Sequence, residues 1–369
     1  MESYPLPVLS LEEFERALLK KPTRFPRSGQ WELTFRCNYR CQHCYISPED
    51  LSGKSKDRDL TTEEAFSVLD QLEKAGVLYL TFTGGDPLLR RDFLEIYLAA
   101  RKKAFLITVF TNGSLVTDRV AETWKECPPL MVEISLYGIT QKTYEEITQI
   151  PGSFEKCLQG IRRLVERRIP LTLKTPGLTL NHEEILRIKD FAYSVGAQFK
   201  FDADIRPRLD GSKEPLAFRL TPDQVIEIEY RDQEMREEWR ERFEKDCGAL
   251  APPSDLVFPC SVERQSFYIG PDGHLIHCGV TRTPSYDLRQ YRVEEAFQEM
   301  EGRLRQLKQP GGSAPHTCSA PTQCMRCPGR ALLEEGDPTK AVRYFCEVTE
   351  KRVQEKGKLY DKEPCHADH

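Results

Sequence analysis

The chain has 369 residues, of which 39% are hydrophobic and 30% charged, and a formal net charge of −5. This is the composition of an ordinary globular protein of one or two domains, and the small acidic surplus argues against nucleic-acid or anionic-membrane partners. No apolar run approaches the roughly 18 residues of a membrane span, and the N-terminus lacks the pattern of a signal peptide. We therefore expect a cytoplasmic protein.

Six short runs rich in β-branched and aromatic residues recur between helical stretches. They cover residues 31–35, 77–83, 105–111, 131–137, 170–175 and 197–203. Near-continuous apolar character is typical of strands buried on both faces of a parallel sheet. Six strand–helix units in about 175 residues fall short of the eight units of a full barrel. The predicted fold class is α/β, a partial (β/α)6 barrel.

Helix signals lie between these strands. Thr61 and Glu64 fit a capping box, and Gly76 lies where that helix should end. Asn181 and Glu184 repeat the start signal, so we expect a second capped helix at about 182–195.

Beyond residue 205 the character of the chain changes. Thr221-Pro222 predicts the start of a strongly charged helix that runs to about residue 245, with a solvated charged face. A cysteine-rich region follows it. The predicted divisions are an N-terminal extension (1–30), the partial barrel (31–206), a charged helical linker (207–254), a C-terminal cysteine-rich domain (255–350) and a tail (351–369).

Thirteen cysteines are unusual for a chain without a secretion signal, and in a reducing compartment they indicate metal ligation or thiol chemistry. Cys37, Cys41 and Cys44 form a C-x3-C-x2-C run directly after the first strand, at the mouth where β/α barrels carry their chemistry. Zinc normally requires a fourth ligand, and His43 is poorly placed beside Cys44. An iron–sulfur cluster with one open iron fits three thiolates better.

This run and its context resemble the radical S-adenosylmethionine (SAM) superfamily. The second strand ends in Thr83-Gly84-Gly85-Asp86-Pro87, similar to that family's Gly-Gly-Glu-Pro motif with Asp in place of Glu, and polar residues follow at later strand ends. The resemblance implies that the three cysteines hold a [4Fe–4S] cluster and that SAM binds its open iron. The SAM contacts that it implies are Tyr45, Thr83, Gly84, Gly85, Asp86, Asn112, Ser135 and, more weakly, Lys174 and Asn181.

The cysteines of the last third resemble the SPASM extension of radical SAM enzymes, so the resemblance implies a C-terminal cysteine-rich iron–sulfur domain at 255–350. Cys260 and Cys278 fit C-x12-G-x4-C around Gly273. The resemblance implies one auxiliary cluster on Cys260, Cys278 and Cys327, and a second on Cys318, Cys324 and Cys346. One cysteine of the usual pattern is missing because position 315 is Pro, so His316 is either a replacement ligand or an exposed loop histidine. Zinc ribbons are the alternative interpretation.

The resemblance implies reductive cleavage of SAM, followed by hydrogen abstraction by a 5′-deoxyadenosyl radical. SPASM enzymes mostly modify ribosomally made peptides by crosslinking, epimerisation or backbone excision, so a precursor peptide is the expected substrate. Sulfatase maturation is disfavoured because Gly279 stands where those members carry an acid. The alternatives are a radical SAM enzyme for a small molecule and a non-enzymatic iron–sulfur electron carrier.

Two further expectations concern partners and proton transfer. Residues 1–30 are too few for a leader-gripping domain, so a separate leader-binding protein is expected, together with an external electron donor such as flavodoxin or ferredoxin. Asp202 and Asp204, at the end of the sixth strand, are candidates for holding substrate or taking a proton. Ion pairs at a strand end are the other explanation for these two carboxylates.

Overall fold

The computed structural model describes residues 25–53, 59–246, 255–260, 265–310 and 327–359. Within them one sheet has the strand order β6-β5-β4-β3-β2-β1-β7-β8-β9. The first six strands pair in parallel, each with the next along the chain. Their bounds are β1 Ser28–Thr34, β2 Tyr79–Gly84, β3 Leu106–Thr111, β4 Met131–Ser135, β5 Leu171–Pro176 and β6 Gln198–Asp202. The predicted partial barrel is confirmed.

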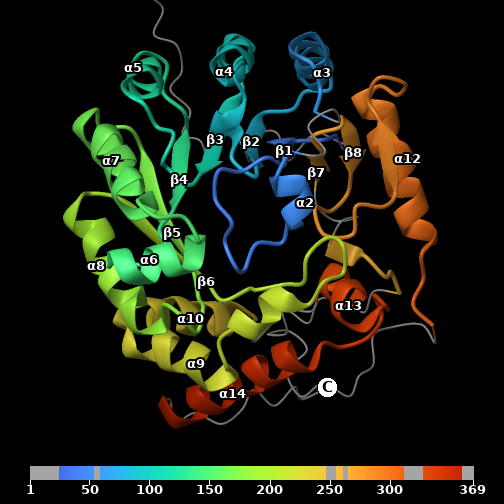
Figure 1. Ribbon diagram of the computed structural model, residues 1–369. Coiled ribbons are helices and arrows are strands. Elements are labelled where there is room, and N and C mark those ends of the chain that lie inside the picture. Colours follow the sequence, from blue (N-terminus) through green and yellow to red (C-terminus); the bar gives the residue numbers. More distant parts are fainter. Residues whose placement is uncertain (1–24, 54–58, 247–254, 261–264, 311–326, 360–369) are drawn as a thin grey trace, which may run out of the picture.

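Helices cover the outer face of this curved sheet (Figure 1). They are α3 Thr62–Lys74, α4 Phe93–Lys102, α5 Asp118–Glu126, α7 Ser153–Glu166 and α8 Ile185–Ser194. The shorter α2 (Pro48–Leu51) and α6 (Gln141–Thr148) follow β1 and β4. None of the described helices is long and apolar enough to cross a membrane.

The alternation of side chains along each strand separates the core from the barrel interior. In β4, Val132 and Ile134 are fully buried in the main core, whereas Glu133 and Ser135 line an interior cavity. Because successive residues point to opposite faces of a sheet, every strand delivers alternate side chains to that interior. This is why polar residues are found inside strands that otherwise read as apolar.

One of the two predicted capping boxes forms. The Oγ1 atom of Thr61 accepts from the backbone N–H of Glu64, and the Glu64 carboxylate accepts from the N–H of Thr61. Gly76 follows the end of α3 with a φ of +81°, as a helix terminus favours. The second box is wrong, because Asn181 makes no cap bond and α8 starts only after the 3-10 turn η3 (His182–Glu184).

The charged segment after residue 221 is two helices, not one. Thr221 caps α9 (Pro222–Arg231) as predicted, and α10 (Gln233–Asp246) follows after a break at Asp232. The Asp232 carboxylate accepts from Lys189 Nζ at 2.5 Å and from the N–H of Met235 at 2.9 Å. It therefore serves as a local start signal for α10.

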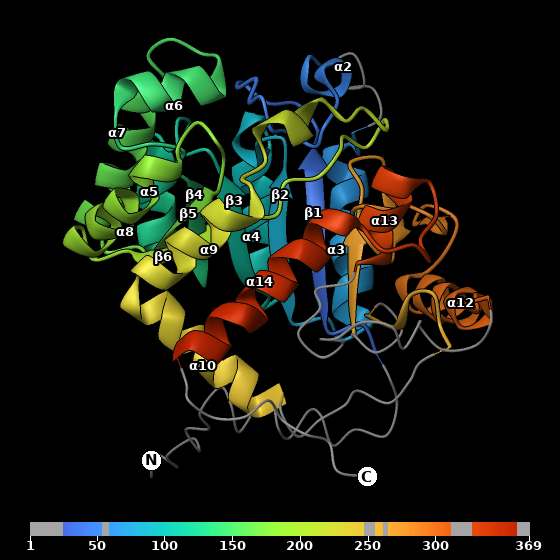
Figure 2. The ribbon, with the colours of Figure 1, turned by 90° about the horizontal axis from the view of Figure 1, so that it is seen from below.

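The region beyond residue 255 continues the same sheet. Strand β7 (Ser266–Ile269) pairs in parallel with β1, and the antiparallel β8 (His274–Ile276) and β9 (Ser285–Asp287) complete the order. No strands were predicted there. The remaining helices are α12 (Val293–Gln306), α13 (Pro328–Glu335) and α14 (Arg343–Leu359). Figures 1 and 2 place α9, α10 and α14 across the open side of the strand arc.

A buried ion pair joins α14 to α9. Arg352 donates to both oxygens of Glu229 at 2.9 and 2.5 Å, and the two side chains are only 8% and 5% exposed. The guanidinium also lies 3.9 Å from the ring centroid of Trp239 on α10. The interpretation of this segment's charges as a solvated face is therefore wrong for Glu229.

We expect Arg352→Leu to lower the free energy of unfolding by about 3–5 kcal/mol, because it leaves the Glu229 carboxylate buried without its partner. Urea unfolding followed by circular dichroism measures this. The double variant Arg352→Leu/Glu229→Leu should recover much of the loss. Arg343→Leu is the matched control on the same helix, since the Arg343 side chain is 90% exposed. Equal effects at the two arginines would contradict the prediction.

Candidate functional site: a cysteine-lined cavity at the barrel mouth

A cavity of about 400 Å³ opens at the carboxyl ends of the barrel strands. It is lined by Cys37, Cys41 and Cys44, from the loop between β1 and α2. None of these three thiols is in a disulfide. Of the predicted SAM contacts, the cavity wall includes Tyr45, Thr83, Gly84, Gly85, Asn112, Ser135 and Lys174. The structure therefore brings together groups separated by as many as 137 positions in the chain.

The cysteine loop is held rigidly by its neighbours. The backbone N–H of Arg40 donates to Thr148 O at 3.0 Å, and that of Gln42 donates to Ile147 O at 3.1 Å. The hydroxyl of Tyr39 donates to Ser153 O at 3.1 Å from a fully buried position. The end of α6 and the start of α7 thus fix the loop's position over the barrel.

The three thiols suit a metal cluster. Burial raises the pKa of Cys37 to about 12 and raises the pKa values of Cys41 and Cys44, and the charge of each of Cys37 and Cys44 adds to the rise at Cys41. Binding of a positively charged group favours the thiolate form of such buried thiols. The N–H of Tyr39 and Asn112 Nδ2 point at Cys37 Sγ, at 3.4 and 3.9 Å. Such donors stabilise the sulfur ligands of iron–sulfur clusters.

The described residues do not form a ready site for a single metal ion. Among the described residues, no group of three or more His, Cys, Asp or Glu side chains converges on one metal-ion position. Three cysteines are the number of protein ligands that an iron–sulfur cluster with one open iron would need.

The glycine turn, formed by Gly84 and Gly85 at the end of β2, packs closely against the segment that leads into the cysteine loop. A Cβ on Gly85 would lie 2.3 Å from both Phe35 O and Arg36 O, and one on Gly84 would lie 2.1 Å from Thr34 O. Gly84 also has a φ of +128°, which favours glycine. The N–H of Gly85 donates to Thr34 O at 2.8 Å, and that of Asp86 donates to Arg36 O at 2.9 Å.

Asp86 lies behind the cavity wall, and it is absent from the residues that line the cavity. Its fully buried carboxylate accepts from the N–H of Leu88 at 3.0 Å, the N–H of Asn112 at 2.9 Å and Thr111 Oγ1 at 2.8 Å. Burial raises the pKa of Asp86 to about 6, and these three donors oppose the rise. Asp86 therefore joins the ends of β2 and β3 and positions Asn112.

Asn181, the weakest of the implied contacts, has a structural role. Its Nδ2 donates to Tyr137 O at 2.9 Å and to Pro176 O at 3.0 Å, and its Oδ1 accepts from the N–H of Leu178 at 2.8 Å. The side chain is fully buried, and it joins the segments that follow β4 and β5.

Sequence reasoning missed a buried network of charged side chains at the cavity. The hydroxyl of Tyr45 donates to Glu32 Oε1 at 3.1 Å, and Arg282 pairs with Glu32 Oε2 at 2.6 Å. The Arg206 guanidinium lies 4.5 Å from the centroid of the Tyr45 ring. Glu32 is only 3% exposed. The sequence did contain a signal for this network, namely a glutamate inside an otherwise apolar strand. A carboxylate that is buried in this way needs a partner.

Asp202 and Asp204 line the cavity, but both are ion-paired. Lys174 Nζ lies 3.6 Å from Asp202 Oδ2. The Asp204 carboxylate pairs with Arg330, on α13. Both arrangements match the alternative explanation for these residues, ion pairs at a strand end.

The predicted auxiliary ligands are only partly within the described residues. Cys278 follows β8, Cys327 is the N-cap of α13, and Cys346 lies on α14. Cys260 is exposed. His316, Cys318 and Cys324 lie outside the described residues. Position Gly329 on α13 packs against Val280, since a Cβ there would lie 3.1 Å from that side chain. The start of α13, with Cys327, is thus packed on the turn after Cys278.

The barrel segment of the chain is similar in sequence to known proteins. Residues 31–192 match the family model described as the radical SAM superfamily. The chain is 26% identical over 315 residues to the sporulation killing factor maturation protein SkfB of Bacillus subtilis, covering 85% of this chain and 71% of SkfB. It is 31% identical over 175 residues to the AdoMet-dependent heme synthase of Methanosarcina barkeri, covering 47% of this chain.

These matches do not all span their relatives. The chain covers about half of the heme synthase (49%) and 38% of the mycofactocin maturase MftC of Mycolicibacterium smegmatis, to which it is 33% identical over 160 residues. Among solved structures, Streptococcus suis SuiB bound to S-adenosylmethionine matches with a TM-score of 0.67 at 14% identity, covering 94% of this chain and 83% of SuiB. The protein anSMEcpe with bound AdoMet matches at 0.63 and 14%, covering 90% of this chain and 94% of that one.

Proposed function

We propose that the protein is an enzyme that cleaves SAM reductively at a [4Fe–4S] cluster held by Cys37, Cys41 and Cys44, because residues 31–192 match the model of the radical SAM superfamily. One observation carries the proposal. A single cavity is lined by these three thiols, the glycine turn and the polar ends of β3, β4 and β5. When bound, the cluster supplies the electron that breaks the sulfonium–C5′ bond of SAM, and the 5′-deoxyadenosyl radical so released abstracts hydrogen from the substrate.

The chain's own residues bind and orient SAM in this proposal. Lys174 and Ser135, paired across β5 and β4, offer a cation and a hydroxyl for a carboxylate. The backbone N–H of Asn112 donates to Asp86. Its side-chain amide is held by Asn38 and Ser114 beside Cys37, so this polar group has a fixed position at the cavity. Tyr45, held between Glu32 and Arg206, presents an aromatic face to the cavity. Preorganised groups of this kind lose little freedom when they bind.

Apolar side chains restrict water at the site. Ile46 and Leu51 line the cavity together with Phe110 and Tyr137. A dry cavity protects a reactive radical from side reactions. The imidazole of His43 lies against Tyr137, with ring centroids 5.0 Å apart, and burial lowers the pKa of His43 to about 4. The neutral ring therefore adds no charge beside the cysteines.

A ribosomally made peptide is the substrate class that we propose. The match to SkfB, named as a maturation protein, covers 85% of the chain and so extends past the barrel into the cysteine-rich region. MftC is likewise named as a maturase, and SuiB has been solved with its precursor peptide SuiA. The alternative is a small-molecule substrate, supported by the heme synthase match, which spans 175 residues. Crosslinking, epimerisation and backbone excision all stay open.

The auxiliary clusters are part of the same proposal. Packing of α13 on the turn after Cys278 supports a shared site for Cys278 and Cys327, with Cys260 as the third ligand. Gly279 lines the main cavity, and a Cβ there would lie 3.1 Å from the Tyr268 ring. An acid at that position would be crowded, which supports the prediction against sulfatase maturation. A second cluster on Cys318, Cys324 and Cys346, a separate leader-binding protein and a flavodoxin or ferredoxin donor stay predictions.

Mass spectrometry tests the peptide proposal. Peptides encoded beside the gene are incubated anaerobically with the reconstituted protein, SAM and dithionite, with and without any candidate leader-binding protein encoded nearby. We expect one peptide to change mass, with much lower turnover at low peptide concentration when its partner is omitted, because a partner raises the local concentration of the peptide. Turnover of a metabolite with every peptide unchanged would support the small-molecule alternative instead.

A further inference from the structure

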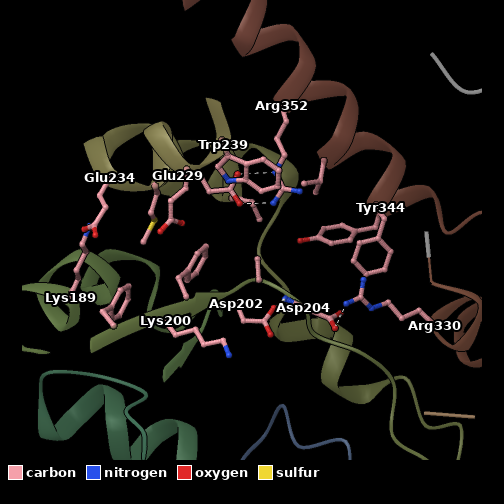
Figure 3. A pocket seen from close by; sticks show the side chains of 18 of the residues that line it. Lys189, Lys200, Asp202, Asp204, Glu229, Glu234, Trp239, Arg330, Tyr344 and Arg352 are labelled. Carbon is pink, nitrogen blue, oxygen red and sulfur yellow. Dashed lines mark hydrogen bonds and ion pairs between the residues drawn. The ribbon is translucent and has the colours of Figure 1, made fainter. Parts of the chain in front are cut away.

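A second cavity, of about 410 Å³, adjoins the first and has no role in the proposed SAM chemistry. It lies between β6, α8, α9, α10, α13 and α14, and Asp202 and Asp204 line both cavities. Figure 3 shows these two aspartates and Lys200 on the strand side, with Trp239, Glu229 and Arg352 on the helical side. The shared aspartates place the second cavity next to the site at which hydrogen abstraction is proposed.

The cavity runs along the edge of β6, not over one of its faces. Six consecutive residues, 199 to 204, line it. Because side chains alternate between the faces of a strand, a cavity over one face would be lined by every second residue. An unbroken series requires that the cavity face the strand's backbone edge.

That edge is free within the described part of the chain. Strand β6 is the last in the sheet order and pairs only with β5 there. The carbonyl of Asp202 accepts from the N–H of Gly177 at 2.8 Å, on the β5 side. Backbone groups point to alternate sides along a strand. Those of Phe199 and Phe201 therefore point to the free edge, where a further strand can pair with them.

The walls of the cavity suit apolar side chains better than a charged ligand. Apolar and aromatic residues come from both sides, namely Phe199, Phe201, Met235, Trp239, Tyr344 and Phe345. The cations already face acids. Lys189 pairs with Asp232 and Glu234. Arg330 pairs with Asp204, and Arg352 with Glu229. Lys200 Nζ lies 3.6 Å from Glu133 Oε1. No strong positive field is left for a phosphate or nucleotide.

We propose that this groove binds an extended, apolar segment of the substrate peptide as an added strand on the free edge of β6, next to the residue that is modified. Main-chain hydrogen bonds to Phe199 and Phe201 give the affinity, and alternate side chains of the peptide enter the aromatic walls, as in other cases of strand addition. The inference rests on the proposed peptide substrate and adds where and in which conformation that substrate is held.

The test uses the full-length, reconstituted protein and a phage library that displays random dodecapeptides. We expect the selected peptides to carry apolar residues at alternate positions and, when bound, to slow hydrogen exchange at the amides of Phe199 and Phe201. Ala203→Trp fills the groove without touching the SAM cavity and should weaken their binding by at least about tenfold. Gln306→Trp, at an exposed site on α12, adds the same side chain elsewhere and should leave binding unchanged.

Formation of 5′-deoxyadenosine in the absence of peptide tests the proposed SAM cleavage independently of the groove proposal. Ala203→Trp should keep this activity, which also shows that it folds. Glu238→Trp, from the exposed part of α10 that lines the groove, blocks the opposite wall independently. If both variants bind the selected peptides as tightly as the wild type, or if the library yields no binder, the groove proposal is wrong while SAM cleavage stands. If the wild type forms no 5′-deoxyadenosine from SAM and dithionite, the proposed function itself fails.

Discussion

Replacing Cys37, Cys41 and Cys44 together by Ala is expected to abolish formation of 5′-deoxyadenosine and to remove about a third of the bound iron. Loss of one supporting contact around a metal typically costs about 10–100-fold in affinity or activity. Removing every protein ligand of the cluster should therefore cost more than about a thousandfold, because without the cluster no electron reaches SAM. The one-third figure follows from three predicted clusters. Iron and sulfide assays on the anaerobically reconstituted protein measure it.

Cys127→Ala is the matched control for this experiment. Cys127 follows the last turn of α5, and its hydrogen bonds there are made by its backbone: the carbonyl accepts from the Tyr97 hydroxyl at 2.7 Å, and the N–H donates to Thr123 O at 2.9 Å. Its removal takes away one thiol without touching the cavity, so iron, sulfide and SAM cleavage should match the wild type. Stoichiometric zinc without sulfide in the wild type would end the cluster interpretation. A triple variant that still cleaves SAM would exclude these cysteines as its ligands.

The barrel could be predicted because its signals are local. Each of the six strands is an apolar run bounded by turn or helix signals, and the observed strands begin or end within three residues of the predicted ranges. The capping box at Thr61 formed because both partners lie within one turn, and the second partner of Glu64, Arg289, lies 3.7 Å from the carboxylate oxygen that the box does not use. In these places local preference and tertiary structure agree.

The wrong expectations have a common physical cause, which is competition from distant partners. Asn181 has the residue type of a helix cap, but its amide is used by the carbonyls of Tyr137 and Pro176. Glu184 binds instead the N–H groups of Ile139 and Thr140, at 2.6 and 3.1 Å. Neither partner was visible in a local window of sequence.

The C-terminal strands were missed for a different reason. Strands β8 and β9 have three residues each, and β7 has four. A run that short carries almost no periodic signal. Their pairing depends on β1, which lies more than 230 positions earlier in the chain. The same extension of the sheet brings Arg282 to Glu32. Because these strands were not predicted, the ion pair between Arg282 and Glu32 at the cavity was not predicted either.

The candidate site was partly predictable because barrel topology gathers strand ends. The motifs after β1, β2 and β3 are far apart in sequence, but parallel neighbours carry their carboxyl ends to one mouth. Asp86 shows the limit of this reasoning. Motif position suggested a ligand contact, whereas burial and three hydrogen bonds make it a support for Asn112. Position in a motif indicates a region of the site but not which way a side chain points.

Gly85→Ala is the second change for which we expect a large effect, and the structure alters the reason for it. The sequence implied that Gly85 contacts SAM, so a side chain there would obstruct SAM directly. In the structure the added Cβ would lie 2.3 Å from Phe35 O and Arg36 O. These are rigid backbone atoms of the segment that leads directly into Cys37. The cysteine loop itself must therefore shift.

We accordingly expect Gly85→Ala to lower both cluster iron and SAM cleavage, and to destabilise the protein by about 1–3 kcal/mol, as overpacking in a buried site usually does. Gly302→Ala is the control, because that glycine lies within α12 and a Cβ there meets nothing within 4 Å. It should be neutral or slightly stabilising, since alanine favours helix over glycine. Iron content, calorimetric SAM affinity and thermal unfolding are measured on both variants. Full cluster content in Gly85→Ala with weakened SAM binding would restore the direct role of this glycine at SAM. Unchanged iron content, SAM affinity and stability would contradict the prediction. They would show that the turn at Gly85 can shift away from Phe35 and Arg36 without disturbing the cysteine loop.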